Sequence, residues 1–171
     1  MNSLECRVYY DSTQHAEPPA ACGERLDVHT DPEAVQSLIR LGLSPRTDLP
    51  AVFLSEPGGR VRILAVRLAP GELESLAAGR GLSGIPTGRL LVYSSDWCPD
   101  CRRAKRVLEE AATSFEEINI DQNPQAEAMV LERSGGRRVV PTLRFDDRLW
   151  AFNPDPPLLR RLLQSDKEIS A

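Results

Sequence analysis

Two cysteines separated by two residues, Cys98 and Cys101, are the side chains of this sequence best suited to covalent chemistry. The apolar run at residues 90–93 precedes them and predicts a strand. Pro99 then predicts the start of a helix, because proline lacks the N–H that would have no partner in a first helical turn. The apolar residues that follow have the spacing of one buried helical face: Ala104, Val107, Leu108, Ala111 and Ala112. We therefore expect a strand, a short turn that delivers Cys98, and a helix.

The start of a helix favours the ionised form of a cysteine, because unpaired N–H groups and the positive end of the helix dipole lie there. Positive side chains in the next turn act in the same direction: Arg102, Arg103 and Lys105. In such settings the pKa of a cysteine can fall from about 8.5 to roughly 3.5–7.5. We expect Cys98 to be the attacking thiol and Cys101, one turn deeper, to be the less exposed thiol that closes a disulfide. The negative charge of Asp100 opposes ionisation of both.

A C-x-x-C pair can instead be half of a zinc site, which needs two further ligands. The other candidate ligands lie far upstream: Cys6, Cys22, His15 and His29. A strand followed by Trp97, the cysteine pair and a helix is more typical of redox chemistry. A second redox signal is Pro141 in the sequence Val-Val-Pro-Thr at residues 139–142. It suggests a cis peptide beside the disulfide, the alternative being an ordinary proline at the start of a strand.

Composition narrows the function classes. The chain has 171 residues and is 41% hydrophobic, which predicts a packed core. Its net charge of −4 does not favour nucleic-acid binding. No run of about 20 apolar residues predicts a membrane span, and residues 1–6 lack the features of a secretory signal. Four cysteines in a chain of this size do not indicate a disulfide scaffold, so we expect a reducing, cytoplasmic setting.

Two domains are predicted, residues 1–78 and 89–165, joined by a Gly-rich linker at 79–88 and followed by a polar tail at 166–171. The two halves align as an internal repeat. Val28 to Pro32 corresponds to Ile118 through Pro124, and the segment beginning at Leu49 corresponds to the one beginning at Val140. The Pro-to-Pro separations are 18 and 17 residues. We interpret the chain as two copies of a β-α-β-α-β-β-α plan, the first with its opening helix reduced or lost, although chance similarity between common α/β elements is the alternative.

The first copy has no C-x-x-C, but Cys22 falls near the position of its missing helix. A thiol there could be a residual nucleophile or could pair with Cys6. We favour a third interpretation, in which Cys22 is a small apolar residue in or near the core.

The second half resembles the glutaredoxin family, and within it the mycoredoxin-like and related small-redoxin branch. The resemblance covers about residues 88–164, and these segments carry it: residues 91–101, Ile120-Asp121, Gly135-Gly136, residues 139–142 and Phe152-Asn153-Pro154. It implies a four-stranded mixed sheet with flanking helices. The first half resembles a degenerate thioredoxin fold, so the expected class is α/β with tandem thioredoxin-like folds, the first truncated.

The resemblance also implies the roles of individual residues. Cys98 attacks a disulfide and forms a mixed disulfide, which Cys101 or a small thiol resolves. The backbone of Val140, next to a cis Pro141, pairs with an extended substrate. The residues expected to contact substrate are Trp97, Val140, Pro141, Thr142, Asn153 and Asp155. Asn153 and Asp155 lie where the family holds the carboxylate end of a small thiol, but residues 151–155, Ala-Phe-Asn-Pro-Asp, depart from the usual glutathione pattern.

The predicted function is that of a thiol–disulfide oxidoreductase, which needs no metal or organic cofactor. It acts on disulfide-containing client proteins. A low-molecular-weight thiol such as glutathione or mycothiol, or a flavoprotein reductase, supplies its electrons. The first half is expected to be a non-catalytic module for substrate docking or homodimer formation. The alternative function is a metal or iron–sulfur binding module that uses Cys98 and Cys101.

Overall fold

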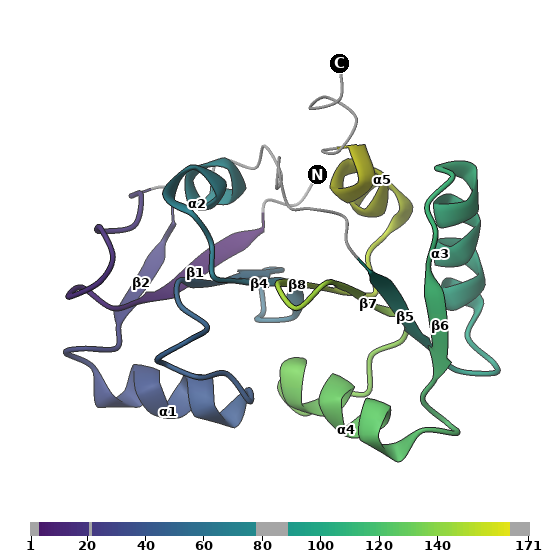
Figure 1. Ribbon diagram of the computed structural model, residues 1–171, viewed down its shortest axis with the longest axis horizontal. Helices are drawn as coiled ribbons and strands as arrows, with labels where there is room; N and C mark the ends of the chain where they lie inside the picture. The colour runs from purple at the N-terminus through teal and green to yellow at the C-terminus, as the bar shows by residue number, and fades with distance from the viewer. Residues whose placement is uncertain (1–3, 21, 78–88, 165–171) are drawn as a thin grey trace. The chain divides into compact units, whose positions relative to one another are not determined.

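A computed structural model describes residues 4–20, 22–77 and 89–164 of the chain (Figure 1). The chain forms two compact units, Met1–Arg80 and Gly81–Ala171. The predicted linker at 79–88 and the predicted tail at 166–171 lie outside the described residues. None of the helices in the described ranges is long and apolar enough to span a membrane.

Residues 89–164, the described part of the second unit, form a four-stranded mixed sheet with three helices. Its elements in chain order are β5 (Leu90–Ser94), α3 (Pro99–Glu110), β6 (Glu116–Asn119), α4 (Pro124–Arg133), β7 (Thr142–Phe145), β8 (Leu149–Phe152) and α5 (Pro156–Gln164). The strand order is β6-β5-β7-β8, with β5 and β6 parallel and the other two pairs antiparallel. Helices α3 and α5 pack against each other, and α4 covers the opposite face from α5 (Figure 1). This is an α/β thioredoxin-like fold.

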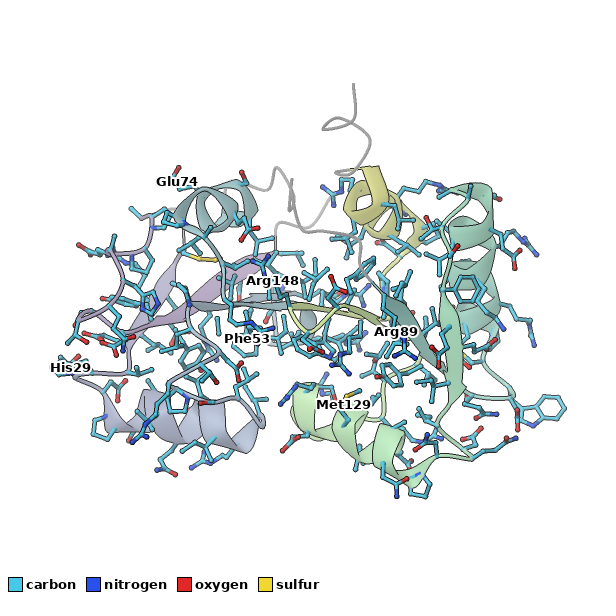
Figure 2. The ribbon with its side chains drawn as sticks, in the orientation of Figure 1. His29, Phe53, Glu74, Arg89, Met129 and Arg148 are labelled. Carbon is cyan, nitrogen blue, oxygen red and sulfur yellow. A yellow bond between two sulfur atoms is a disulfide. The ribbon has the colours of Figure 1, made fainter. Side chains whose placement is uncertain are left out.

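The helices of this unit begin where the sequence supplies a cap followed by proline. Cys98 is the N-cap of α3, and Asn123 is the N-cap of α4, where its side chain accepts the Ala126 N–H at 3.0 Å. Both caps precede a proline, whose missing N–H costs nothing in a first turn. Under α4, a core cluster joins the sheet to the helix: Tyr93, Ile120, Ala126 and Val130. Met129, labelled in Figure 2, packs against this cluster.

The described residues of the first unit form a four-stranded mixed sheet with two helices. Its elements are β1 (Glu5–Tyr10), β2 (Glu24–Asp27), α1 (Pro32–Arg40), β3 (Ala51–Ser55), β4 (Val61–Val66) and α2 (Pro70–Ala77). The strand order is β2-β1-β3-β4, again with one parallel pair, β1 with β2, and two antiparallel pairs. The described residues between β1 and β2, 11–20 and 22–23, contain no helix. Each unit has a cis proline just before an inner strand, at Leu49–Pro50 and at Val140–Pro141.

Two expectations from helical and strand spacing are wrong in detail. The spacing of Val35, Leu38 and Ile39 predicts one apolar helical face, but Ile39 is 51% exposed, and Ala34 and Leu38 are the buried residues of α1. The alternation of residue types at 25–29 predicts a strand over that range, but β2 ends at Asp27, because the Asp27 carboxylate accepts the N–H of His29 and turns the chain. Local alternation of residue types did not reveal this side-chain contact.

Cys22 is not the unpaired apolar residue that we favoured. It is 1% exposed, as a core residue would be, but it forms a disulfide with Cys6. The parallel register of β1 and β2 explains the pairing. Arg7 lies opposite Glu24, so the preceding residues of both strands approach each other, and Cys22 reaches Cys6. The pairing with Cys6, one of the three alternatives, is the one that the structure contains.

Candidate redox site

The site is built around a disulfide between Cys98 and Cys101, whose Cα atoms are 5.2 Å apart. Cys98 has extended backbone geometry, with φ −95° and ψ 102°, and is the N-cap of α3. Its Sγ accepts a hydrogen bond from the Cys101 N–H at 2.9 Å. One backbone donor of the first helical turn is therefore directed at the sulfur that the sequence nominates as the nucleophile.

Both sulfurs lie close to the surface without being open to it. Cys98 is 7% exposed and Cys101 is 2% exposed, so the order of exposure is the predicted one. Trp97, immediately before the pair, is 90% exposed. An exposed large aromatic side chain next to a reactive sulfur offers apolar contact area to a docking molecule.

Asn153 connects three parts of the site. Its backbone N–H donates to the Pro141 carbonyl at 2.7 Å, and its side-chain amide donates to an Asp100 carboxylate oxygen at 3.3 Å. Its φ of +43° is a left-handed conformation that asparagine tolerates better than most residues. The segment before α5 is thereby held against both the cis proline and Asp100, which immediately precedes Cys101.

The cis peptide predicted at Val140–Pro141 is present. Pro141 is buried, and Thr142 begins β7, which pairs with β5 so that Thr142 lies opposite Tyr93. The Thr142 hydroxyl donates to the Val139 carbonyl at 2.8 Å and is fully buried. That contact closes the turn around the cis proline and fixes the backbone of Val140, which remains partly exposed.

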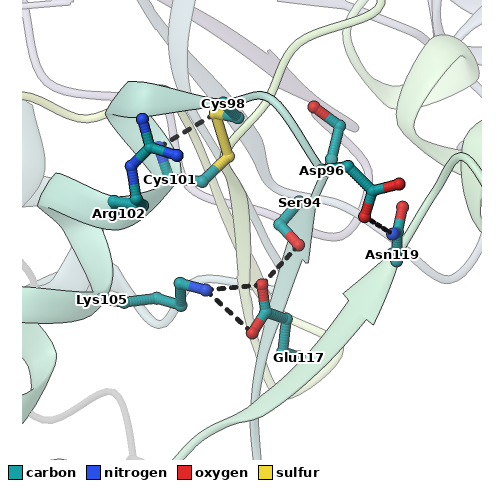
Figure 3. A pocket seen from close by; sticks show the side chains of 9 residues that line it. Ser94, Asp96, Cys98, Cys101, Arg102, Lys105, Glu117 and Asn119 are labelled. Atoms are coloured by element: carbon teal, nitrogen blue, oxygen red, sulfur yellow. Dashed lines mark hydrogen bonds and ion pairs between the residues drawn. A yellow bond between two sulfur atoms is a disulfide. The ribbon is translucent and has the colours of Figure 1, made fainter.

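A polar cleft of about 380 Å³ lies on the other side of the disulfide, between α3 and β6 (Figure 3). Its lining residues are Ser94, Ser95, Asp96, Cys98, Cys101, Arg102, Lys105, Glu117 and Asn119. Helix α3 contributes the positive side chains of Arg102 and Lys105 to one wall of the cleft. Strand β6 contributes the carboxylate of Glu117 and the amide of Asn119 to the other. The expected substrate residues from Val140 to Asp155 are not among those that line this cleft.

Glu117 organises the charges of the cleft. The Lys105 ammonium lies 2.8 and 3.0 Å from its two carboxylate oxygens, and the Ser94 hydroxyl donates to it at 2.6 Å (Figure 3). The hydrogen bond from Lys105, and next that from Ser94, lower the pKa of Glu117 below its ordinary value. Glu117 is thus a carboxylate at neutral pH, and it neutralises the cation that shares a cleft with Cys101.

The loop before Cys98 is tied to the end of β6. The Asn119 amide donates to an Asp96 carboxylate oxygen at 2.7 Å, and the Asp96 N–H donates to the Asp121 carboxylate at 3.2 Å. Asn119 also accepts the Asp121 N–H at 2.9 Å. These contacts fix the turn that delivers Cys98 to the start of α3.

The residues predicted to be catalytic or to bind substrate do not all lie at one position in the structure. Cys98 and Cys101 are bonded, and Asn153 links Asp100 to Pro141. Asp155 instead caps α5, where its carboxylate accepts the Leu158 N–H at 2.8 Å. The sequence does not single out Ser94, Glu117 or Asn119, which also line the cleft. Their proximity depends on the parallel register of β5 and β6, which places Ser94 opposite Asn119, and the sequence does not show this register.

The described residues contain no group of three or more His, Cys, Asp or Glu side chains arranged to hold a metal ion. Cys98 and Cys101 are bonded to each other.

Sequence comparison matches the second unit to one family of known proteins. The family model described as Glutaredoxin matches residues 90–150. Mycoredoxin 1 of Corynebacterium glutamicum is 36% identical over 63 residues, which are 37% of this chain and 77% of that protein. A glutaredoxin of Pseudomonas aeruginosa is 37% identical over 82 residues, 48% of this chain and 96% of that protein. A solved structure of NrdH-redoxin from Escherichia coli, 33% identical, covers 44% of this chain and 95% of that chain with a TM-score of 0.37.

The second unit is thus a thioredoxin-like domain with a dithiol–disulfide pair at the start of a helix. The chain belongs to the glutaredoxin family. This membership and the paired cysteines support thiol–disulfide oxidoreduction as the general class of activity.

Proposed function

We propose that this protein reduces protein disulfides, or mixed disulfides between a protein and a small thiol, through Cys98 and Cys101. The main support is one observation: Cys98 caps α3, accepts the Cys101 N–H, and is bonded to the sulfur of Cys101. A helix N-terminus stabilises a thiolate, and a second thiol one turn away can displace whatever the first has captured.

The proposed reaction exchanges one disulfide for another. The Cys98 thiolate attacks one sulfur of the substrate disulfide, so a Cys98–substrate S–S bond forms and the other sulfur leaves as a thiolate that takes a proton. Cys101 then loses its proton and attacks the Cys98 sulfur. The second substrate sulfur leaves, and the Cys98–Cys101 disulfide forms. Two electrons pass from the dithiol to the substrate.

The substrate surface that we propose lies on the side of the cis proline. The partly exposed backbone of Val140, beside buried Pro141 and Thr142, suits pairing with an extended peptide. Trp97 offers an exposed aromatic face to a client protein. Asn153 and Asp155 flank the position proposed for a small thiol, because Asn153 is held against Asp100.

The reductant is proposed to be a low-molecular-weight thiol such as glutathione or mycothiol, with a flavoprotein reductase as the alternative. The chemistry requires no metal or organic cofactor, because cysteine sulfurs carry both electrons. A reducing compartment such as the cytoplasm suits a catalytic pair of this kind.

We further infer that the two units are tandem copies of one fold, the first without its opening helix. The matching strand orders and the cis prolines at Pro50 and Pro141 support this. The first unit has no C-x-x-C, so we assign it to client docking or to homodimer formation. Sedimentation velocity of the full chain over a range of concentrations tests the dimer.

The decisive experiment measures turnover of a protein–small-thiol mixed disulfide by the wild type, Cys98→Ser and Cys101→Ser. Cys98→Ser should abolish turnover, and Cys101→Ser should retain part of it, because a small thiol can resolve the intermediate. Equal loss in both variants indicates a strictly dithiol route. Undiminished turnover by Cys98→Ser would falsify the assignment, and iron or zinc bound in proportion to protein would favour the metal-binding alternative.

A further inference from the structure

The carboxylate of Asp121, just beyond β6, connects the turn before Cys98 to the loop before the cis proline. One of its oxygens accepts the backbone N–H of Asp96 at 3.2 Å, and the other pairs with the guanidinium of Arg138. Asp96 stands two residues before Cys98, and Arg138 stands two residues before Val140. We call these two contacts the Asp121 bridge. A single side chain thus joins the turn that carries the nucleophile to the loop that carries the proposed docking backbone.

Both ends of the Asp121 bridge are held by further contacts. The Asp121 N–H donates to the Asn119 side chain at 2.9 Å, and the Nε of Arg138 donates to Glu127 of α4 at 2.7 Å. Arg138 thus contacts two carboxylates with two different nitrogens of one planar group. Because that plane is rigid, the two contacts fix its direction as well as its position.

A second link crosses the redox site after Cys98. Asn153 donates to the Pro141 carbonyl at 2.7 Å and to the Asp100 carboxylate at 3.3 Å. Asp100 follows Cys98, whereas the Asp121 bridge acts on the residues before it. A substitution in the Asp121 bridge therefore leaves the second link intact, so the loop can shift without coming free.

The Asp121 bridge contributes more to position than to stability. The side chain of Arg138 is 41% exposed and that of Asp121 is 35% exposed. An ion pair as open to water as this adds little to the free energy of folding. The rate of a reaction is more sensitive, because a misplacement of about 1 Å between reacting groups can lower it by about a hundredfold.

We propose that Asp121 and Arg138 are positioning residues, which set the separation between the Cys98 sulfur and the backbone of Val140. This inference rests on the proposed function and specifies which substrates need the bridge. A client that docks as an extended strand must pair with the Val140 backbone while its disulfide lies within reach of Cys98, so its rate depends on the separation. A small disulfide meets Cys98 alone. The exchange itself is the one described above, and neither positioning residue gains or loses protons or electrons in it.

The test uses two probes that contain the same kind of disulfide and differ in the backbone around it. One is a short, uncharged, end-blocked peptide whose central cysteine is joined to 2-mercaptoethanol. The other is N-acetylcysteine amide joined to 2-mercaptoethanol. Each kcat/KM is divided by the rate constant with which dithiothreitol reduces the same probe, and the ratio of the two results is the peptide preference. Because neither probe is charged, loss of a charged side chain does not change their attraction to the protein.

Two variants in one loop are compared with the wild type. Arg138→Gln removes the ion pair with Asp121, and Arg137→Gln removes the same charge from the neighbouring exposed residue. The wild type should prefer the peptide. Arg138→Gln should lower this preference by about fivefold to twentyfold, a part of the loss that a misplacement of about 1 Å can cause. Arg137→Gln should leave the preference within about twofold, and all three proteins should reduce the N-acetylcysteine probe at rates within about twofold, which shows that they are folded.

Three more variants test whether the two residues act as a pair. Asp121→Asn keeps an oxygen for the Asp96 N–H but removes the charge that holds Arg138. It should lower the peptide preference as Arg138→Gln does. The double variant should lose no more than about the larger of the two single losses, because both changes break the same contact. Arg138→Lys should recover only part of the preference, because an ammonium group cannot bind both carboxylates with one rigid plane.

Equal losses with both probes in Arg138→Gln, or no loss with either, overturn the positioning role. Additive losses in the double variant overturn the assignment to a pair. A wild type that reduces both probes at the same normalised rate also overturns the inference, because the backbone around the disulfide then makes no difference. Turnover of neither probe by the wild type overturns the proposed function itself, which is a different result from turnover without a peptide preference.

Discussion

The backbone N–H of Cys101 donates a hydrogen bond to the Sγ of Cys98 at 2.9 Å. When the disulfide is reduced, the same donor is in position to bind a thiolate, and a hydrogen bond to a charged acceptor is roughly twice as strong as one to a neutral acceptor. Asp100 lies between the two cysteines and pairs with Arg103 at 2.9 Å, so its negative charge is only partly offset.

The first prediction concerns the acidity of Cys98. In the reduced protein, the alkylation rate of Cys98 plotted against pH should have a midpoint below about 8.5, the value of an unperturbed cysteine. Asp100→Asn should move the midpoint to lower pH, because it removes a negative charge that disfavours the thiolate. Glu109→Gln, an exposed change at the far end of α3, is the matched control and should move it little. A midpoint above 8.5 in the wild type contradicts activation by the helix.

The second prediction separates the capping role of Cys98 from its chemistry. Cys98→Ser and Cys98→Ala are compared in a Cys101→Ser background, so that neither variant can form the Cys98–Cys101 disulfide. Cys98→Ser keeps an acceptor for the N–H of residue 101, whereas Cys98→Ala leaves that donor unpaired. Urea unfolding should show Cys98→Ala to be less stable than Cys98→Ser by about 0.5–2 kcal/mol. Equal stability of the two would mean that the sulfur does not cap α3.

Local sequence signals predicted the parts of the site that are built from neighbouring residues. Strand β5, the turn and the start of α3 follow from an apolar run, two cysteines and Pro99. The cis peptide at Pro141 followed from its place before a strand in a redox domain. The internal repeat also placed Pro50 opposite Pro141, and both peptides are cis.

Contacts between strands were not predictable in the same way. Glu117 reaches Lys105 and Ser94 only because β6 lies parallel to β5 in one particular register. The Cys6–Cys22 pair likewise depends on the register of β1 and β2. Spacing along one element says which face a residue occupies, but not which residue of another strand stands opposite it.

The third prediction uses the pH dependence of the Glu117 contacts. Lys105, and then Ser94, lower the pKa of Glu117 in the folded protein. As the pH falls, Glu117 is therefore protonated at a higher pH in the unfolded chain than in the folded protein. The stabilisation is therefore present above the ordinary glutamate pKa of about 4.3, and it is lost as the pH falls through the lower folded value. Glu117→Gln should lower the free energy of unfolding at pH 7, and the difference from wild type should diminish at pH 3.

Urea unfolding of the wild type and of Glu117→Gln at pH 7 and pH 3 measures this difference in the free energy of unfolding. Glu109→Gln removes an exposed carboxylate from α3 and should give a difference near zero at both. A Glu117→Gln difference that is the same at pH 3 and pH 7 would show that the hydrogen bonds of the carboxylate do not contribute to stability.

The last prediction concerns the Cys6–Cys22 disulfide, which joins β1 to the chain just before β2, where the described residues form no helix. A disulfide that closes a loop of about 15 residues stabilises a fold by about 3 kcal/mol, chiefly by restricting the unfolded chain. In a Cys98→Ser/Cys101→Ser background, dithiothreitol should lower the free energy of unfolding by about 2–4 kcal/mol and speed hydrogen exchange in β1 and β2. The same background with Cys6→Ala and Cys22→Ala should not respond to the reductant. Two free thiols in the native, unreduced background protein would show that Cys6 and Cys22 are not bonded, and the stabilisation predicted for them would then be absent.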